Sequence, residues 1–137
     1  MKGFTFIELL IVIAVMVLLA TIGTATSRIL MQARDVKRAS IMHDVQNALG
    51  LYDIRNGQYF NTTNDFCGVI NILVTGNYLP VAPFDPKTQT AICGVGNSYI
   101  GGAMYNYTAT PSSGTASSYV LTLVKESGGR ADFYSPQ

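Results

Sequence analysis

An apolar segment near the start of the chain, residues 4–27, constrains its folding more than any other feature. It contains one charged side chain, that of Glu8, at its head. Built as an α-helix at about 1.5 Å per residue, the segment is roughly 36 Å long, which is enough to cross the ~30 Å hydrocarbon core of a bilayer. We therefore predict a membrane-spanning helix and ask why it keeps a carboxylate.

The residues that follow predict an amphipathic helix over 28–56. Apolar side chains recur there at helical spacing and mark one face for packing: Ile41, Val45, Ala48, Leu49 and Tyr52. Asn56 and Gly57 mark its end, because both residues tolerate the left-handed conformation that terminates helices. No proline interrupts residues 1–79. The two segments therefore predict one helix of about 50 residues, with Gly23 and Gly50 as its weak points.

The remainder, 57–137, predicts a small β-rich domain. Strand-like residues 104–110 and 118–124 flank a turn-rich stretch and indicate an antiparallel hairpin, and a further strand is expected near 98–102. So few strands cannot bury both faces of a sheet, so we expect the sheet to pack on the amphipathic helix. The predicted class is α+β, a long amino-terminal helix packed against a small antiparallel sheet.

Charge and motifs argue against several function classes. The formal charge is +1, which gives no global field for attracting nucleic acid. The sequence contains no phosphate-binding loop, no H-E-x-x-H and no C-x-x-C motif, and His43 is its one histidine. We expect His43 to be an ordinary solvated or half-buried helix residue. The chain is therefore predicted not to be an enzyme, and no cofactor is assigned.

The stretch Gly3-Phe4-Thr5-Phe6-Ile7-Glu8, followed by the apolar segment, resembles the processing motif of type IV pilins and of type II secretion pseudopilins. The resemblance implies that a prepilin peptidase removes residues 1–3 by cutting after Gly3, that the new terminus at Phe4 is N-methylated, and that Glu8 acts in filament assembly. Residues 48–60 and 76–86 resemble a helix end and a loop of the same proteins. The resemblance to these proteins also implies a pilin-like fold in which residues 4–27 form the transmembrane and filament-core helix.

The function that this resemblance implies is that of a structural subunit, a pilin, polymerising through its amino-terminal helix. Its partners would be other copies of the chain, the prepilin peptidase, and a pilus or secretion assembly platform with its ATPase. The subunit would wait in the cytoplasmic membrane with its domain outside and then join a cell-surface or envelope filament. The alternatives are a type II secretion pseudopilin and a membrane-tethered extracytoplasmic binding protein. A removed secretory signal is a further alternative, although the apolar segment exceeds the roughly 7 to 15 residues that such signals need.

Orientation and the role of Glu8 each have competing interpretations. Basic residues closely follow the apolar segment at Arg28, Arg34, Lys37 and Arg38, and the positive-inside rule alone would place them in the cytoplasm. We give the processing motif more weight than this count. Thr5 and Glu8 also fit a capping box, which stabilises a helix start by about 1 kcal/mol. Assembly and capping are compatible roles for Glu8.

The cysteines and the carboxyl-terminal acids complete the predictions. An even cysteine count in a domain placed outside the cytoplasm predicts a Cys67–Cys93 disulfide, against the alternative of two buried free thiols.

Major pseudopilins often bind calcium near the carboxyl terminus. After residue 86 this chain has only Glu126 and Asp132 as acids, fewer than a calcium site of six to eight oxygens favours. No metal site is therefore predicted. Many pilins also carry a proline where this chain has Ala25.

Overall fold

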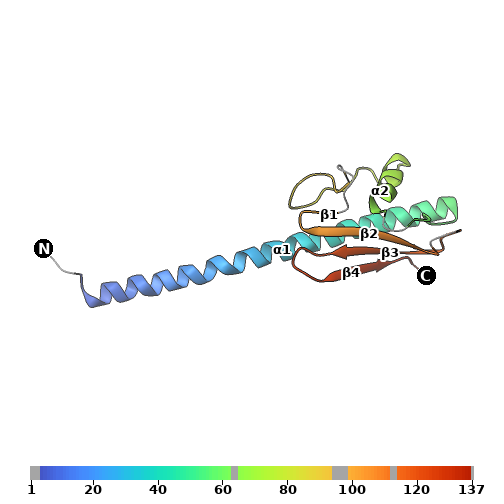
Figure 1. The fold of residues 1–137 in the computed structure, drawn as a ribbon. Coiled ribbons are helices and arrows are strands. Elements are labelled where there is room, and N and C mark those ends of the chain that lie inside the picture. Colours follow the sequence, from blue (N-terminus) through green and yellow to red (C-terminus); the bar gives the residue numbers. More distant parts are fainter. Residues whose placement is uncertain (1–3, 63–64, 94–98, 112–113, 137) are drawn as a thin grey trace.

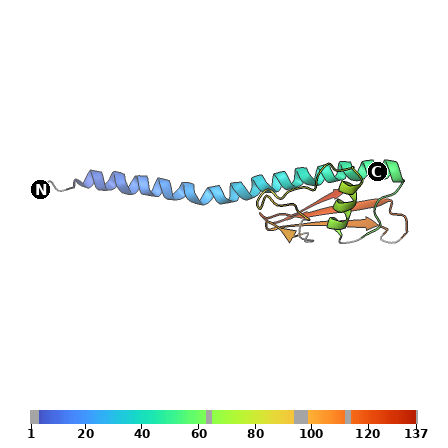
Figure 2. The same ribbon diagram turned by 90° about the horizontal axis from the view of Figure 1, so that it is seen from above.

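The computed structural model describes residues 4–62, 65–93, 99–111 and 114–136, without the side chains of 21–25 and 99. It contains helices α1 (Phe6–Asn56) and α2 (Phe66–Thr75) and strands β1 (Tyr99–Ile100), β2 (Ala103–Thr110), β3 (Ser118–Val124) and β4 (Arg130–Tyr134). The strands form one antiparallel sheet in the order β1-β2-β3-β4. The predicted α+β class is confirmed. Figures 1 and 2 show α1 projecting far beyond the domain that its carboxyl-terminal half supports.

Both ends of α1 have a local cause in the sequence. At the start, the carboxylate of Glu8 accepts hydrogen bonds from the backbone N–H and the hydroxyl of Thr5, at 2.9 Å and 2.8 Å. At the end, Gly57 takes a left-handed conformation with φ of 72°, and its N–H donates to the carbonyl of Asp53. A residue with a side chain adopts this conformation at a cost, which is why glycine is common at this position.

One face of the sheet packs against α1 and α2 to form the core. The predicted hairpin corresponds to β2 and β3, which pair from Met104 with Val124 to Thr110 with Ser118. Tyr105, Tyr107 and Leu121 are fully buried among the strands. The helices contribute further buried apolar side chains to this core, among them Met42, Val45 and Leu49 from α1 and Phe66, Ile70 and Leu73 from α2.

The sequence did not predict two of the elements. Helix α2 is only ten residues long and mostly apolar, and so short an apolar run fits a buried strand as well as a helix. Its start is fixed by Asp65, whose carboxylate accepts the N–H of Gly68 at 2.8 Å. Strand β4, with the sequence RADFY, lacks β-branched residues and includes two charges. Its pairing with β3 makes it a strand despite its low propensity.

The predicted disulfide between Cys67 and Cys93 is confirmed, with a Cα–Cα distance of 5.3 Å. It joins α2 to the end of the loop that follows it, residues 76–93. This loop crosses back to α1 and carries Asp85, a fully buried acid.

Among the residues whose side chains are described, no helix offers an apolar stretch long enough to cross a membrane. The predicted span 4–27 includes residues 21–25, whose side chains lie outside that description. Gly23, predicted as a weak point, lies within α1, which continues through it. The other weak point, Gly50, lies within α1, and α1 continues through it to Asn56. The membrane-spanning role of residues 4–27 therefore stays a prediction.

Candidate functional site

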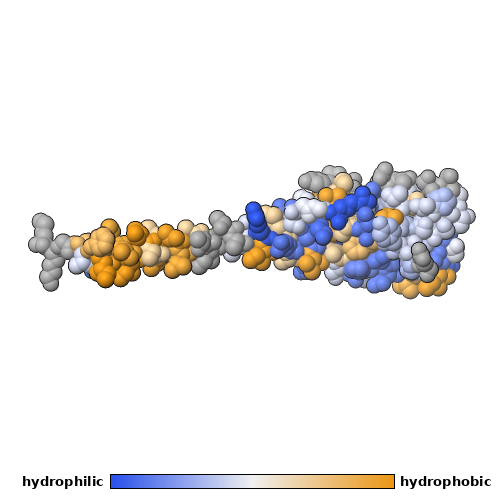
Figure 3. Space-filling view, turned by 90° about the horizontal axis from the view of Figure 1, so that it is seen from below, coloured by the Kyte–Doolittle hydropathy of each residue, from blue (hydrophilic) through white to orange (hydrophobic). Residues whose placement is uncertain are grey.

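The amino-terminal part of α1 is an apolar surface that no other described part of the chain covers. Its large hydrophobic side chains between Phe4 and Leu19 are each 45% to 85% exposed. They are Phe4, Phe6, Ile7, Leu9, Leu10, Ile11, Val12, Ile13, Val15, Met16, Val17, Leu18 and Leu19. We call residues 4–19 the apolar rod. Figure 3 shows it standing apart from the more hydrophilic domain. A contiguous apolar surface of this extent marks an interaction with other apolar matter, because soluble monomers rarely expose one.

Glu8 lies at the tip of this rod, about one helical turn beyond Phe4. Its carboxylate is exposed and is held by Thr5, so the capping interaction expected from the sequence is present. The same carboxylate remains open to solvent and can accept a further donor. Phe4 is 85% exposed. Gly3, the residue before the predicted cleavage point, lies outside the described residues.

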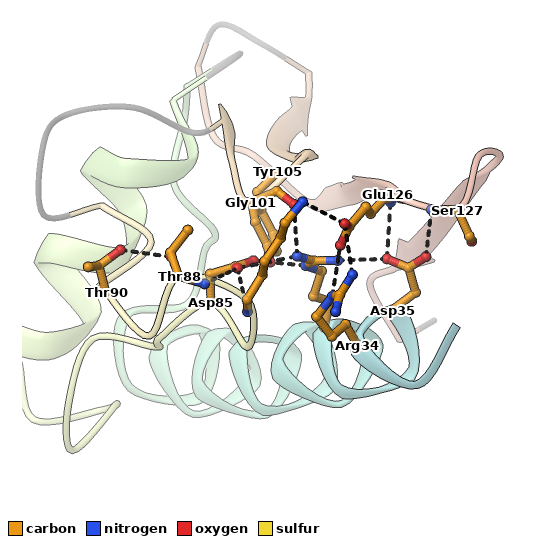
Figure 4. A network of polar contacts seen from close by, with 11 residues as sticks. Arg34, Asp35, Asp85, Thr88, Thr90, Gly101, Tyr105, Glu126 and Ser127 are labelled. Atoms are coloured by element: carbon orange, nitrogen blue, oxygen red, sulfur yellow. Dashed lines mark hydrogen bonds and ion pairs between the residues drawn. The ribbon is translucent and has the colours of Figure 1, made fainter. Parts of the chain in front are cut away.

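A second polar feature lies where the domain begins and was not predicted from the sequence. Arg38 of α1 is fully buried and is surrounded by carboxylates from three parts of the chain. Its guanidinium donates to Asp85 at 2.8 Å and 3.2 Å, to Asp35 at 2.9 Å and to Glu126 at 3.0 Å. A further bond, at 3.2 Å, goes to the backbone carbonyl of Gly101. Figure 4 shows these groups converging above α1.

The outer members of this cluster balance its charge. Glu126 also accepts from Arg34, at 3.0 Å, and from the ammonium of Lys87, at 2.7 Å. The cluster therefore holds three cations and three anions: Arg34, Arg38, Lys87, Asp35, Asp85 and Glu126. We call this set the Arg38 cluster. It ties α1 to the loop 76–93 and to the turn between β3 and β4.

Backbone groups complete the hydrogen bonding of the buried acids. Asp35 accepts the N–H groups of Glu126 and Ser127, at 3.0 Å and 2.9 Å. Asp85 accepts those of Lys87 and Thr88, at 2.9 Å and 3.2 Å. Buried charges are tolerated when they are paired and hydrogen-bonded in this way.

The same contacts determine the pKa values in the cluster. Hydrogen bonds from Arg34, helped by Lys87 and Arg38 against the opposing effect of burial, lower the pKa of Glu126 to about 2. Burial alone would raise the pKa of Asp85, but the bonds from Arg38 and from the two backbone amides lower it below its usual value. Burial likewise would lower the pKa of Arg38, and its three carboxylate partners raise it instead. Glu126, Asp85 and Arg38 are therefore charged at neutral pH.

The sequence contains two signals of this cluster in retrospect. Arg38 precedes Met42, Val45 and Leu49 at helical spacing, so it occupies a core position of the amphipathic face. Gly101 has a φ of 63°, and a β-carbon there would collide with the carboxylate of Asp85 and with the guanidinium of Arg38. Neither signal identifies the acids, because they are brought to Arg38 from positions up to 88 residues away.

The other residues considered from the sequence have ordinary surroundings. His43 is exposed on α1, where its ring contacts Gln46 and the edge of Phe133. Asp132 is bonded to Arg130 and Thr122 on the sheet, while Glu126 belongs to the Arg38 cluster. Within the described residues, no group of three metal-ligating side chains comes together.

Comparisons of the chain with protein-family models, with curated proteins and with solved structures find no match.

Proposed function

We propose that this chain is a structural subunit of a type IV pilus-like filament and that it polymerises through α1. The observation that carries the proposal is the exposed apolar rod of residues 4–19, attached to a domain that closes its own core without it. At about 25 cal/mol per Å² of apolar surface removed from water, covering this rod is strongly favourable. Identical rods lying side by side would cover one another.

Glu8 would give this association its register. In the proposal, cleavage after Gly3 creates a positive amine on Phe4, about one helical turn from the carboxylate. An acid within a membrane costs about 2.5 to 3.5 kcal/mol at its centre and less near its interface, and pairing with the amine of an adjacent helix offsets that cost. Apolar contact between helices has little preference for one axial position. The charge pair selects one.

The proposed location is the cytoplasmic membrane, with the domain outside, followed by a cell-surface or envelope filament. The disulfide supports an oxidising compartment for the domain. Prepilin peptidase, an assembly platform and its ATPase are the proposed partners. A type II secretion pseudopilin would mature identically but would form a short envelope filament needed for secretion.

Filament yield from Glu8→Ala, expressed without wild-type subunit in cells that contain the peptidase and assembly machinery, tests the proposal. We expect the variant to be inserted and cleaved but to give no filaments, and Glu8→Asp to assemble in part because its side chain is shorter. Thr5→Ala is the matched control, since it removes the hydroxyl that caps Glu8 and leaves the carboxylate in place. Its filament yield should stay near that of the wild type.

The mass of the mature amino-terminal peptide gives an independent test. A chain that begins at Phe4 with a methylated amine supports the proposal. A native chain that retains Met1, or one that has lost the whole apolar segment, would instead favour a tethered or secreted binding protein, as would a monomer in detergent. Normal filaments from Glu8→Ala would overturn the pairing role and leave capping as the whole role of that carboxylate.

A further inference from the structure

Two cations lie unpaired at the neck of the molecule, where α1 enters the domain. Arg28 lies on α1 and Lys125 directly follows β3, and neither forms an ion pair with another described residue. Both border the same surface, because Arg28 lines one hollow and Lys125 an adjoining one that share Gln32 and Ser127. We call Arg28 and Lys125 the neck cations.

The acids of this region leave the neck with a net positive charge. Asp35 and Glu126 lie nearby, but the Arg38 cluster and backbone amides already occupy their oxygens. The next acid along α1, Asp44, is sixteen residues beyond Arg28, a distance of about 24 Å along the axis. Uncompensated positive charge therefore gathers at the end of the domain that faces the apolar rod.

We propose that the neck cations bind the phosphate groups of an anionic phospholipid surface while the subunit waits in the membrane. This inference rests on the proposed function, because it requires the apolar half of α1 to be inserted. Arg28 directly follows the predicted span 4–27, so an inserted helix places it at the headgroup level. A guanidinium group can donate two parallel hydrogen bonds to two oxygens of one phosphate. Long basic side chains also extend so that their charged ends reach the membrane–water interface.

Lys125 is held close enough to take part. The turn that it begins is bonded to α1 through Asp35, which accepts the N–H groups of Glu126 and Ser127. Asp35 is seven residues beyond Arg28, or about 10 Å along the helix, so Lys125 lies within roughly one Debye length of the headgroups. Each such cation strengthens attraction to an anionic surface by about fivefold. Lipid contact would therefore hold the domain against the membrane before the subunit is extracted.

Backbone hydrogen exchange of the turn Lys125–Gly129 tests the inference in the full-length chain reconstituted into vesicles. One set of vesicles contains phosphatidylcholine alone, and the other contains equal parts of phosphatidylcholine and phosphatidylglycerol. We expect exchange at least about threefold slower in the anionic vesicles, with the difference lost in high salt. Flotation of the same vesicles reports separately whether the helix is inserted.

Matched variants assign the effect to the neck. Arg28→Gln should lose part of the protection and Arg28→Gln/Lys125→Gln all of it. Arg55→Gln removes the same charge from α1 about 40 Å farther along and should change nothing. Circular dichroism checks that each variant is folded. If a variant does not fold, the comparison of low and high salt on the unaltered chain still tests the inference.

Each unfavourable result has a distinct meaning. Inserted protein with equal exchange in both vesicle types overturns the lipid inference and leaves the filament proposal standing. Protection that rises with protein density instead of anionic lipid assigns the neck to a second copy and also overturns it. Protein that fails to float with the vesicles contradicts the membrane-anchored function itself, and the lipid inference with it.

Discussion

Replacing Arg38 by methionine tests whether the Arg38 cluster holds the domain together. Arg38→Met keeps a long side chain in the core but removes the guanidinium cation. That cation donates hydrogen bonds to the carboxylates of Asp35, Asp85 and Glu126. The three acids are affected unequally. Glu126 keeps Arg34 and Lys87, whereas Asp85 is fully buried and keeps only two backbone amides and a long bond from Tyr105.

The expected loss follows from that inequality. Removing one partner of a buried ion pair costs about 3 to 5 kcal/mol, because the other charge stays buried. Asp85 and Asp35 both meet that description, since each is buried and has Arg38 as its only cation partner among the described residues, so we expect a loss at the upper end of this range or above it. Against a total stability of about 5 to 15 kcal/mol, this is a large fraction. The melting temperature should fall by more than about 10 °C.

Urea unfolding of the full-length chain in detergent, followed by near-ultraviolet circular dichroism of the buried tyrosines, measures the loss. Lys37→Met is the matched control, since it removes the neighbouring cation of α1, which is exposed and forms no ion pair among the described residues. Its stability should stay within about 0.5 kcal/mol of the wild type. The double variant Arg38→Met/Asp85→Leu should recover part of the loss, because no unpaired acid is then left at position 85. A loss below about 1 kcal/mol for Arg38→Met would refute the reasoning.

Three further perturbations have expected outcomes. The folded pKa of Glu126, about 2, lies below its ordinary value of 4.5. The stability that this carboxylate contributes is therefore complete above about pH 5 and is lost as the pH falls toward 2. The midpoint of urea unfolding should be constant above about pH 5 and should decline as the pH is lowered from there toward 2. Replacing Cys67 and Cys93 by serine should cost roughly 3.5 kcal/mol on the chain-entropy model, and intact mass before and after reduction with alkylation confirms the bridge in the native protein. Gly101→Ala should destabilise more than Gly57→Ala in thermal melts, because both glycines have positive φ but only Gly101 is crowded; equal losses would contradict that.

The sequence predicted those parts of the fold that depend on neighbouring residues. The β2–β3 hairpin follows from two segments of strand composition around a turn-rich stretch, and the end of α1 follows from Asn56 and Gly57. Strand β4 was missed because its identity as a strand comes from pairing with β3, and α2 because its length does not separate helix from strand. For β4, tertiary contact decides the state of the segment.

The two polar features differ in the same way. Glu8 and Thr5 are three residues apart, so their interaction could be inferred from the sequence alone. The partners of Arg38 come from 3, 47 and 88 residues away, and no local pattern reports them. The visible signs were an arginine at a core position of α1 and the glycine at position 101, and the acids could be identified only once the loop and the β3–β4 turn had been placed.

The apolar and polar contacts of α1 serve different purposes along its length. Between residues 9 and 19 the helix is apolar on every side, which provides contact area in any orientation. Between Arg38 and Leu49 the apolar face of α1 is buried in the core of the domain. Directional charge is placed next to each region, at Glu8 on the tip of the rod and at Arg38 beside the core. A hydrophobic side chain in either position would keep the apolar contact area but would remove the hydrogen-bonded charge, which adds a directional preference to that contact.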